Sequence, residues 1–488
     1  MSEILDQARK YEKEECGKIK KESRPAFHFS NPVGWMNDPN GFSDYKGEHH
    51  LFFQYYPYAP KWELMYWGHA KSNDFIKWEY LPAALAPDCQ YDHSGVFSGS
   101  AIQDGQKHIL VYTGVDSQKL ENGKTKTLQT QCIAIGDGTD YKKYLQNPVV
   151  TASMLPEGCS FEDFRDPKIW KENDRYYMVV GSRSRDGVGQ AVLFFADKLD
   201  EWKFAGVLDH SEKERSKMWE CPDFFPLSGK QVLLISPQEM EAVGLEFHNG
   251  SNTMFLIGTY DKETMQFTRE CVQCVDYGLD FYAPQTMQTE DDRRILIAWM
   301  QSWDNPIYPD TQRWSGMMSV PRELFIRDGR ICQLPVRELD NYHINEVVYK
   351  DICIEESVQL DGVSGRTVDL MIGLKGNQYT KFRIKLACDG RRYSEIVYDR
   401  EKDTVTFDRT YSGLRKDTLC TRRMKVSNRA GEIKLRILID RYSVEIFVND
   451  GEQVMTSLIY TPLDASEIYF ESNGKTILDV KKYDIEVL

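Results

Sequence analysis

A short hydrophobic strand pattern recurs at nearly equal intervals through more than half of the sequence, and it limits the fold more than any other feature. The five segments start 58, 67, 56 and 63 residues apart, and they are 51–56, 109–113, 176–180, 232–236 and 295–299. A turn rich in Gly, Asp or Asn precedes each segment, which predicts a hairpin with its earlier strand just upstream. A hairpin unit of about 60 residues repeated five times is typical of a five-bladed β-propeller. The alternative is one large β-sandwich with accidental spacing.

Polar residues stand at equivalent positions ten to thirteen residues before these segments, and they are Asp38, Ser98, Asp166, Glu220 and Tyr282. Each opens the earlier strand of its hairpin. If those strands line a central channel, their starts converge at one end of it. Three carboxylates at one channel mouth serve no structural need, because like charges crowded together cost stability. The pattern therefore predicts a functional site at this mouth.

Asp38 lies within the segment WMNDPNG, at positions 35–41. Turn formation alone accounts for Asp, Asn, Pro and Gly at these positions. Taken locally, the segment is therefore equally compatible with a structural turn and with a catalytic acid. The register of Asp38 with Asp166 and Glu220 favours the catalytic interpretation.

Paired carboxylates with aromatic neighbours indicate cleavage of a glycosidic bond. The strand starts carry no His/Ser or His/Cys pair, no phosphate-binding Gly loop and no clear metal cluster, so we expect neither a metal nor a cofactor. Aromatic faces suit a sugar ring, and the candidates are Trp35, Trp62, Phe97, Tyr282 and Trp314. Polar side chains suit its hydroxyl groups, and the candidates are Asn37, Gln54, Ser98 and Arg165.

The charge balance restricts the partners. The 75 acidic and 61 basic residues give a net charge of −14, which opposes binding to nucleic acid and to anionic membranes. No apolar run approaches the roughly 18 residues that span a bilayer, and the first residues lack the apolar core of a signal peptide. We therefore expect a cytoplasmic protein with reduced cysteines that acts on a small-molecule sugar. The oligomeric state stays open, with a homodimer as one alternative.

The strand pattern changes after Trp314, which predicts an all-β chain of two domains. We expect a helical or flexible arm over 1–27, the propeller over 28–320, a linker over 321–344 and a β-sandwich over 345–488. The linker contains a hairpin with an Asp-Gly turn and a helix-like segment at 336–342. We expect the second domain to have a packing role, with an oligomer interface or a further sugar contact as the alternatives.

Six motifs, in this order, closely resemble those of glycoside hydrolase family 32. They are WMNDPNG at 35–41, FSGS at 97–100, RDP at 165–167, ECP at 220–222, DFYA at 280–283 and WSG at 314–316. The segment 440–451 also resembles the C-terminal sandwich signature of that family. The family contains invertases, sucrose-6-phosphate hydrolases, inulinases and levanases.

The resemblance implies a retaining mechanism on a β-linked fructosyl unit. Asp38 matches the nucleophile, Glu220 the general acid/base and Asp166 the transition-state stabiliser. The substrate-contact positions match Asn37, Gln54, Trp62, Phe97, Ser98, Arg165, Tyr282 and Trp314. Retention needs two carboxyl groups about 5 to 5.5 Å apart, and we expect that proximity to leave Asp38 charged and Glu220 protonated. Cys221 either adjusts the surroundings of that acid or only packs.

The expected activity is release of terminal fructose from sucrose, sucrose 6-phosphate or short fructo-oligosaccharides. A fructosyltransferase would use the same residues with a sugar in place of water, and a carbohydrate-binding propeller without catalysis is the alternative from a different class. A requirement for phosphate stays open, because Arg183, Arg185 and Arg313 are equally well explained as ordinary surface charges.

Overall fold

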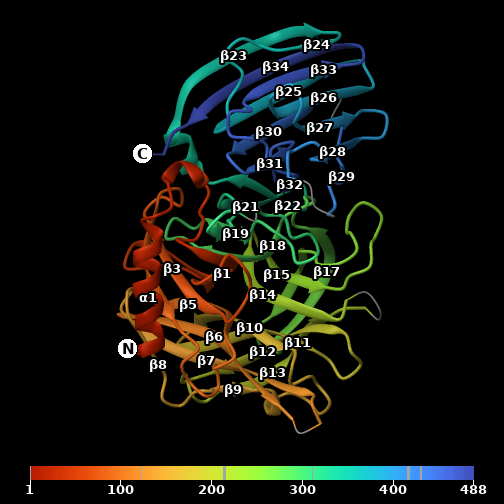
Figure 1. Cartoon of the computed structure of the whole chain (residues 1–488). Helices are drawn as coiled ribbons and strands as arrows, with labels where there is room; N and C mark the ends of the chain where they lie inside the picture. The colour runs from red at the N-terminus through yellow and green to blue at the C-terminus, as the bar shows by residue number, and fades with distance from the viewer. Residues whose placement is uncertain are drawn as a thin grey trace.

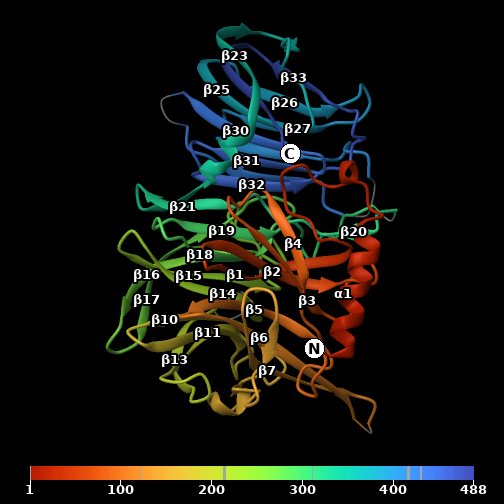
Figure 2. The same cartoon turned by 90° about the vertical axis from the view of Figure 1, so that its left-hand side faces the viewer.

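The structure is a computed structural model that describes residues 2–120, 122–212, 216–309, 311–414, 418–428 and 431–487. Within these residues the strands form seven sheets (Figures 1 and 2). Five sheets from residues 34–335 occupy the lower part of Figure 1, and two sheets from residues 343–485 occupy the upper part. No helix in the described ranges is long and apolar enough to cross a membrane.

The five lower sheets follow one another along the chain. The first has the order β20-β1-β2-β3-β4, with β1 (Gly34–Tyr45), β2 (Glu48–Tyr56), β3 (Tyr66–Ser72), β4 (Trp78–Leu85) and β20 (Trp314–Ser315). The second has the order β5-β6-β7-β8, with β5 (Val96–Asp104), β6 (Lys107–Lys119), β7 (Thr125–Gly136) and β8 (Tyr141–Lys143), and β9 (Val150–Thr151) pairs with β7. A short helix, η2 (Ala152–Met154), follows β9.

The remaining three sheets have four strands each. The third contains β10 (Phe164–Glu172), β11 (Arg175–Arg183), β12 (Gly189–Ala196) and β13 (Lys203–His210). The fourth contains β14 (Met218–Leu227), β15 (Lys230–Gln238), β16 (Met254–Asp261) and β17 (Gln266–Cys274). The fifth has the order β18-β19-β21-β22, with β18 (Tyr282–Gln288), β19 (Arg294–Trp299), β21 (Arg322–Arg327) and β22 (Arg330–Pro335).

The five segments predicted from their spacing are confirmed as the second strands of these sheets, β2, β6, β11, β15 and β19. Three of the predicted two-residue turns have positive φ at both positions, and they are Lys46-Gly47, Asn173-Asp174 and Ser228-Gly229. That geometry matches the twist of the strands it joins. Because each hairpin begins a sheet of its own, the alternative of one large β-sandwich is wrong for this part of the chain.

The first strands, β1, β5, β10, β14 and β18, are neighbours in cyclic order, since β1 contacts both β5 and β18. Each first strand has an irregular register near its start, at 36–39, 97–99, 165–168, 220–223 and 282–285. A bulge bends the strand and redirects a side chain. A proline stands within or beside four of the bulges, where a missing N–H costs no ladder hydrogen bond.

Two six-stranded sheets make up the C-terminal part. One has the order β23-β34-β25-β30-β31-β32, with β23 (His343–Ile354), β34 (Lys475–Ile485), β25 (Val368–Gln378), β30 (Ile433–Asp440), β31 (Ser443–Val448) and β32 (Gln453–Leu458). The other has the order β24-β33-β26-β27-β28-β29, with β24 (Ser357–Val358), β33 (Glu467–Ser472), β26 (Lys381–Cys388), β27 (Ser394–Asp399), β28 (Thr404–Asp408) and β29 (Thr421–Lys425). Buried side chains of both sheets, such as Leu370 and Phe470, belong to one hydrophobic cluster.

The structure differs from the prediction at the linker. The hairpin of β21 and β22 was predicted as part of the connection over 321–344, but β21 pairs with β19 and completes the fifth sheet. The reason is burial, because Leu324 and Ile331 pack in one cluster with Leu296 of β19. The helix-like segment is confirmed as η3 (Arg337–Tyr342), which connects the two parts.

The N-terminal arm is a helix, α1 (Glu3–Cys16), that lies along β4 (Figure 2). A further short helix, η1 (Lys21–Ser23), follows it. Arg9 Nε donates to the carbonyl of Ala83 at 2.8 Å, and Glu12 Oε1 accepts from the Ala83 N–H at 2.9 Å. β4 is the edge strand of its sheet, so the helix covers backbone groups that would otherwise be free to pair with another chain.

A buried network of charged side chains joins the two parts. His28 Nδ1 and Asp440 Oδ2 are 2.8 Å apart, and His28 Nε2 and Glu445 Oε1 are 2.8 Å apart. Arg322 pairs with Asp276 at 3.0 Å and also with Glu445. All five side chains are fully buried. The segment before β1 and the fifth sheet are therefore fixed to β30 and β31 through paired charges.

This network predicts a pH-dependent stability. Burial alone would lower the pKa of His28, but the hydrogen bonds that its ring donates to Asp440 and Glu445 raise the pKa from 6.5 to about 9. The stabilisation by charged His28 is therefore complete below pH 6.5 and is lost as the pH rises through 9. Loss of one partner from a buried pair costs about 3 kcal/mol, so we expect His28→Asn to destabilise the protein by about that amount at pH 7 and by clearly less at about pH 9.5.

Chemical unfolding followed by tryptophan fluorescence at both pH values measures this difference. His93→Asn is the matched control, because His93 lies half-exposed at the surface. An equal loss of stability at both pH values in His28→Asn would show that the charge on His28 contributes nothing.

Candidate active site

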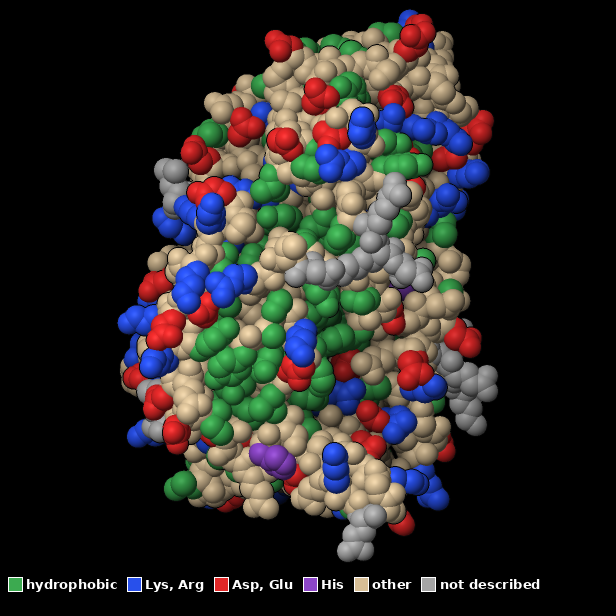
Figure 3. Space-filling view, viewed as in Figure 1, with side chains coloured by type: hydrophobic (Ala, Val, Ile, Leu, Met, Phe, Trp, Pro, Cys, Tyr) green, Lys and Arg blue, Asp and Glu red, His purple; other side chains and the backbone are tan. Residues whose placement is uncertain are grey.

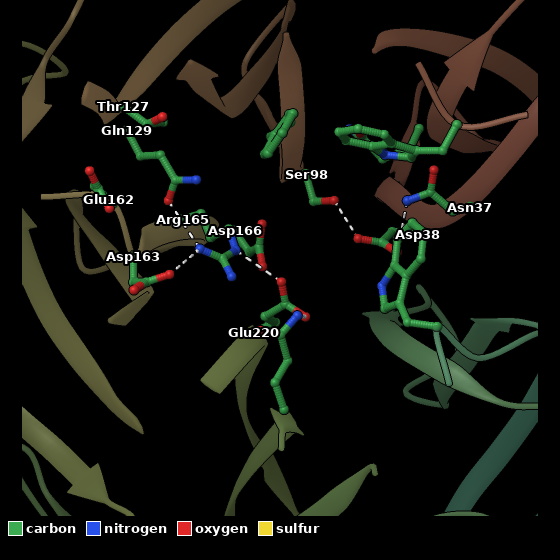
Figure 4. Close-up of a pocket in the computed structure, with 15 residues that line it drawn as sticks. Asn37, Asp38, Ser98, Thr127, Gln129, Glu162, Asp163, Arg165, Asp166 and Glu220 are labelled. Atoms are coloured by element: carbon green, nitrogen blue, oxygen red, sulfur yellow. Dashed lines mark hydrogen bonds and ion pairs between the residues drawn. The ribbon is translucent and has the colours of Figure 1, made fainter. Parts of the chain in front are cut away.

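The starts of the first strands open into a cavity of about 530 Å³ (Figure 4). Its lining residues are Asn37, Asp38, Gln54, Trp62, Phe97, Ser98, Thr127, Gln129, Glu162, Asp163, Arg165, Asp166, Glu220, Gln238 and Trp303. The three carboxylates predicted from strand register, Asp38, Asp166 and Glu220, all lie in it. They come from β1, β10 and β14, which places three different sheets around one space.

Asp38 lies in the bulge of β1 and is buried. Its Oδ2 accepts a hydrogen bond of 2.6 Å from the Ser98 hydroxyl, and its Oδ1 accepts one of 3.1 Å from the Asn37 amide. Burial raises the pKa of Asp38, the hydrogen bond from Ser98 opposes that rise, and the charge of Glu220 adds to it. The carboxylate is thus oriented by two donors and open to the cavity on its remaining side.

Glu220 receives three hydrogen bonds from three different elements. Arg165 Nε donates to Oε1 at 2.9 Å, while Gln238 Nε2 and the Tyr282 hydroxyl donate to Oε2 at 2.7 and 2.6 Å. Donors on both oxygens fix the orientation of this carboxylate. The sequence predicted a protonated Glu220 beside a charged Asp38, and this stays a prediction.

Asp166 lies in the bulge of β10 with φ of 66°, a backbone conformation that few residues with side chains adopt. Its Oδ2 accepts the Cys221 N–H at 2.9 Å, and its own N–H donates to the Thr113 hydroxyl at 2.9 Å. Burial and the charge of Glu220 raise the pKa of Asp166 to about 7. Asp166 can therefore hold or release a proton near neutral pH.

Arg165 is the only Lys, Arg or His among the described residues that line the cavity. Its Nη1 donates to Gln129 Oε1 at 3.2 Å and to Asp163 Oδ1 at 3.1 Å, while its Nε bonds Glu220 (Figure 4). Burial alone would lower the pKa of Arg165, but the neighbouring carboxylates, first among them that of Glu220, raise it. Arg165 thus stays charged and links the acid of β14 to the wall of the cavity.

Cys221 connects two of the acids. Its Sγ lies 3.6 Å from Oδ2 of Asp38 and 3.6 Å from Oδ2 of Asp166. Burial and the charges of these carboxylates raise the pKa of the thiol well above its ordinary value. Of the two interpretations of this cysteine, the contacts support the one in which it belongs to the surroundings of the acids.

Most of the other predicted contact residues line the same cavity. Gln54 lines it and donates to the carbonyl of Val96 at 3.0 Å, and Trp62, 48% exposed, stands edge-on to Phe97 at the rim. Tyr282 does not line the cavity; it is buried behind Glu220 and bonds that acid.

Two of the predicted aromatic residues lie elsewhere. Trp314 does not line the cavity, because its ring packs edge-on against Tyr442 of the C-terminal part in a separate hydrophobic cluster. Trp35 is buried below the cavity, where its Nε1 donates to Asn37 Oδ1 at 2.8 Å and its ring stacks on Trp303. Trp303, and not Trp35, presents an aromatic surface to the cavity.

Six lining residues were not anticipated from the sequence, and they are Thr127, Gln129, Glu162, Asp163, Gln238 and Trp303. Gln238 ends β15, a second strand that returns to the same mouth. Asp163 stands two residues before Arg165. Two signals in the sequence could have indicated such residues, namely a polar residue at the end of a second strand and a polar residue next to a motif.

Two groups of side chains in the described ranges have the composition of metal ligands, and they are Asp88, Cys89 and Asp92, and Asp340, His343 and Asp369. A cation of the protein already sits in each. Lys143 pairs with both acids of the first group, and Arg436 pairs with both acids of the second. Neither group is therefore suited to a metal ion.

Comparison with known proteins identifies the family. The model of the glycosyl hydrolases family 32 N-terminal domain matches residues 28–335, and that of the family 32 C-terminal domain matches residues 338–486. The chain belongs to glycoside hydrolase family 32. It is therefore an enzyme that cleaves glycosidic bonds, as the paired carboxylates predicted.

Named family 32 relatives cover most of the chain. A sucrose-6-phosphate hydrolase of Zymomonas mobilis is 37% identical over 443 residues, which are 88% of this chain and 84% of the relative. A raffinose invertase of Escherichia coli is 36% identical over 458 residues, which are 93% of each chain.

Solved family 32 structures share the architecture. The β-fructofuranosidase BmSUC1 of Bombyx mori is similar with a TM-score of 0.86 and 33% identity, covering 99% of this chain and 98% of that one. A sucrose-6-phosphate hydrolase of Lactobacillus gasseri is similar with a TM-score of 0.85 and 27% identity, covering 99% and 96%. The arrangement of all seven sheets is thus one that family 32 enzymes adopt.

The surroundings of Cys221 predict a slow thiol. Only the thiolate reacts with alkylating reagents, and the raised pKa suppresses it at Cys221. We expect iodoacetamide at pH 8 to label Cys221 at least about tenfold more slowly than the exposed Cys271 and Cys353. Peptide mapping by mass spectrometry over time measures the three rates. Equal rates in the native protein would contradict the assigned surroundings, and unfolding in urea should make the rates similar.

Proposed function

We propose that this family 32 enzyme is a retaining β-fructofuranosidase that releases terminal β-linked fructose from sucrose-type substrates. The observation that best supports it is the meeting of Asp38, Asp166 and Glu220 in one cavity with fixed hydrogen bonds. The names of the relatives agree with it, since they include a raffinose invertase and sucrose-6-phosphate hydrolases. A mutant of BmSUC1 is known in complex with sucrose.

In the first step, a carboxylate oxygen of Asp38 attacks the anomeric carbon of the fructosyl unit. The bond from that carbon to the leaving oxygen breaks, and Glu220 gives its proton to the leaving oxygen. In the second step, Glu220 takes a proton from water, and the resulting hydroxide oxygen displaces Asp38. Two displacements at the same carbon retain its configuration.

Three donors hold Glu220 in place for this chemistry, and they are Arg165, Gln238 and Tyr282. The proton that Glu220 gives to the leaving oxygen in the first step is replaced by the proton that it takes from water in the second. The acid therefore returns to its starting state after each turnover.

Asp166 and the polar lining residues have positioning roles in this proposal. Asp166 would accept hydrogen bonds from fructose hydroxyls and stabilise the positive charge that develops on the ring. Asn37, Gln54 and Ser98 would bond further hydroxyls, and Trp62 and Phe97 would contact the apolar face of the sugar. Arg165 and Tyr282 would act through Glu220, because both already donate to it.

We further propose that the five lower sheets close into a five-bladed β-propeller over residues 28–335 and that the two upper sheets form a β-sandwich over 343–487. The cyclic contacts of the first strands support closure, and so does the parallel pairing of β20 with β1, which ties the end of the fifth unit to the first. A cytoplasmic location and a homodimer stay predictions from the sequence.

Two conservative substitutions test the catalytic roles. We expect Asp38→Asn and Glu220→Gln each to lower kcat for fructose release from sucrose by at least about 10³-fold, because each removes a group that makes or breaks a bond. Chromatographic assay of glucose and fructose measures both hydrolysis and transfer. Asp186→Asn, in an exposed loop, is the matched control. Unchanged hydrolysis in either cavity variant would contradict the assignment.

The pH profile tests the state of the nucleophile. Asp38 must be charged to attack, and its pKa is raised by burial, so activity should be lost with falling pH above the ordinary aspartate value of 3.8. Ser98→Ala removes a donor that stabilises the charge, so the acid limb of kcat/KM should move to higher pH. Ser153→Ala, at an exposed position, should leave the limb in place. A limb that moves to lower pH in Ser98→Ala would refute the role of this hydrogen bond.

A further inference from the structure

The cavity carries far more negative than positive charge. Five carboxylates line it, and they are Asp38, Glu162, Asp163, Asp166 and Glu220. Arg165 is the one cationic side chain among the described lining residues, and it is already bound by Glu220 and Asp163. Even with one proton held by the acid cluster, the lining is clearly anionic.

Glu162 is the acid of this set whose carboxylate accepts no hydrogen bond within the described residues. It is exposed, and it lies on the other side of the cavity from Asp38, beyond Arg165 (Figure 4). Its backbone N–H bonds the Ser160 hydroxyl, but within the described part of the chain its carboxylate has no hydrogen bond and no ion pair. Its carboxylate therefore faces the part of a substrate that extends from the reacting bond toward that side.

Two of the three arginines considered as phosphate contacts are paired with acids. Arg183 Nη2 pairs with Asp163 Oδ2 at 2.8 Å, and Arg313 Nη2 pairs with Glu15 of α1 at 2.7 Å. The third, Arg185, is exposed and does not line the cavity. A phosphate that bound Arg183 would have to compete with Asp163, which lines the cavity.

A sugar phosphate carries about −1.5 to −2 charges near neutral pH, as phosphate monoesters do. Like charges brought together at a binding surface oppose association and are a common means of rejecting wrong ligands. Uncharged sugars meet no such opposition. Figure 3 shows, on one face of the lower sheets, a broad group of hydrophobic side chains with charged side chains of both signs around it.

We propose that this enzyme selects uncharged β-fructosides over phosphorylated ones, and that Glu162 is a specificity-determining residue that disfavours a phosphate on the leaving sugar. The proposal rests on the β-fructofuranosidase function argued above and narrows its substrate class. It separates this chain from the relatives of Zymomonas mobilis and Lactobacillus gasseri, which are named for sucrose 6-phosphate.

The test compares kcat/KM for sucrose and for sucrose 6-phosphate in the wild type, in Glu162→Gln and in Glu263→Gln. Glu263 lies on the exposed turn between β16 and β17 and does not line the cavity, so its variant removes the same charge elsewhere. We expect the wild type to prefer sucrose by about tenfold or more, and Glu162→Gln to reduce that ratio by at least about threefold. Glu263→Gln should keep the wild-type ratio.

Ionic strength supplies a second readout. Salt screens exposed charges, so raising the salt concentration should reduce the preference for sucrose in the wild type and should reduce it less in Glu162→Gln. A wild type that prefers sucrose 6-phosphate would overturn the proposal, and so would equal ratios in the two variants. Release of fructose from neither substrate would instead overturn the proposed function itself, so the two failures are distinguishable.

Discussion

Two buried carboxylates, Asp38 and Asp166, and the partly buried carboxylate of Glu220 share one cavity with a single guanidinium, and the structure around them makes that arrangement stable. Each acid is held by donors from other elements, since Ser98 bonds Asp38, the Cys221 N–H bonds Asp166, and Gln238 bonds Glu220. Without these contacts, the mutual repulsion and loss of hydration would favour neutral acids or a more open site. Ser98 and Cys221 lie on different sheets from the acids that they bond, so the site exists only when those sheets are packed together.

The irregular starts of the first strands direct the acids into this shared cavity. In a regular strand, successive side chains point to opposite faces of the sheet. The side chain of a residue such as Asp166 would then point into the protein core. The bulge at 165–168 with its positive φ directs Asp166 to the cavity instead. Pro167 suits this position because the bulge needs no N–H from it. Proline disrupts a regular strand, but here it is compatible with the bulge at the start of β10.

The C-terminal part has a structural role that reaches the site indirectly. In the buried network of charged side chains, His28 fixes the segment before β1 to β30 and β31, and Arg322 fixes the fifth sheet to β31. β1 carries Asp38, and β18 of the fifth sheet carries Tyr282. The paired charges of this buried interface therefore hold the first and fifth sheets against the C-terminal part. These two sheets carry Asp38 and Tyr282, the proposed nucleophile and a donor to Glu220.

The sequence alone determined the repeat of hairpins, the two-part organisation and the three acids. The spacing of the strands, the turn residues and the equivalent positions of the acids can each be recognised within a single repeat unit. Only the tertiary structure decided what packs opposite each motif. Gln129 and Gln238 reach the cavity from β7 and β15, Trp314 turns instead to Tyr442, and the hairpin of β21 and β22 joins the fifth sheet. The direction of the pKa shift of Asp38 was decided in the same way, since burial raises it and a hydrogen bond from Ser98 of another sheet opposes the rise. A motif fixes the backbone around a side chain, but its partners come from segments far away in the chain.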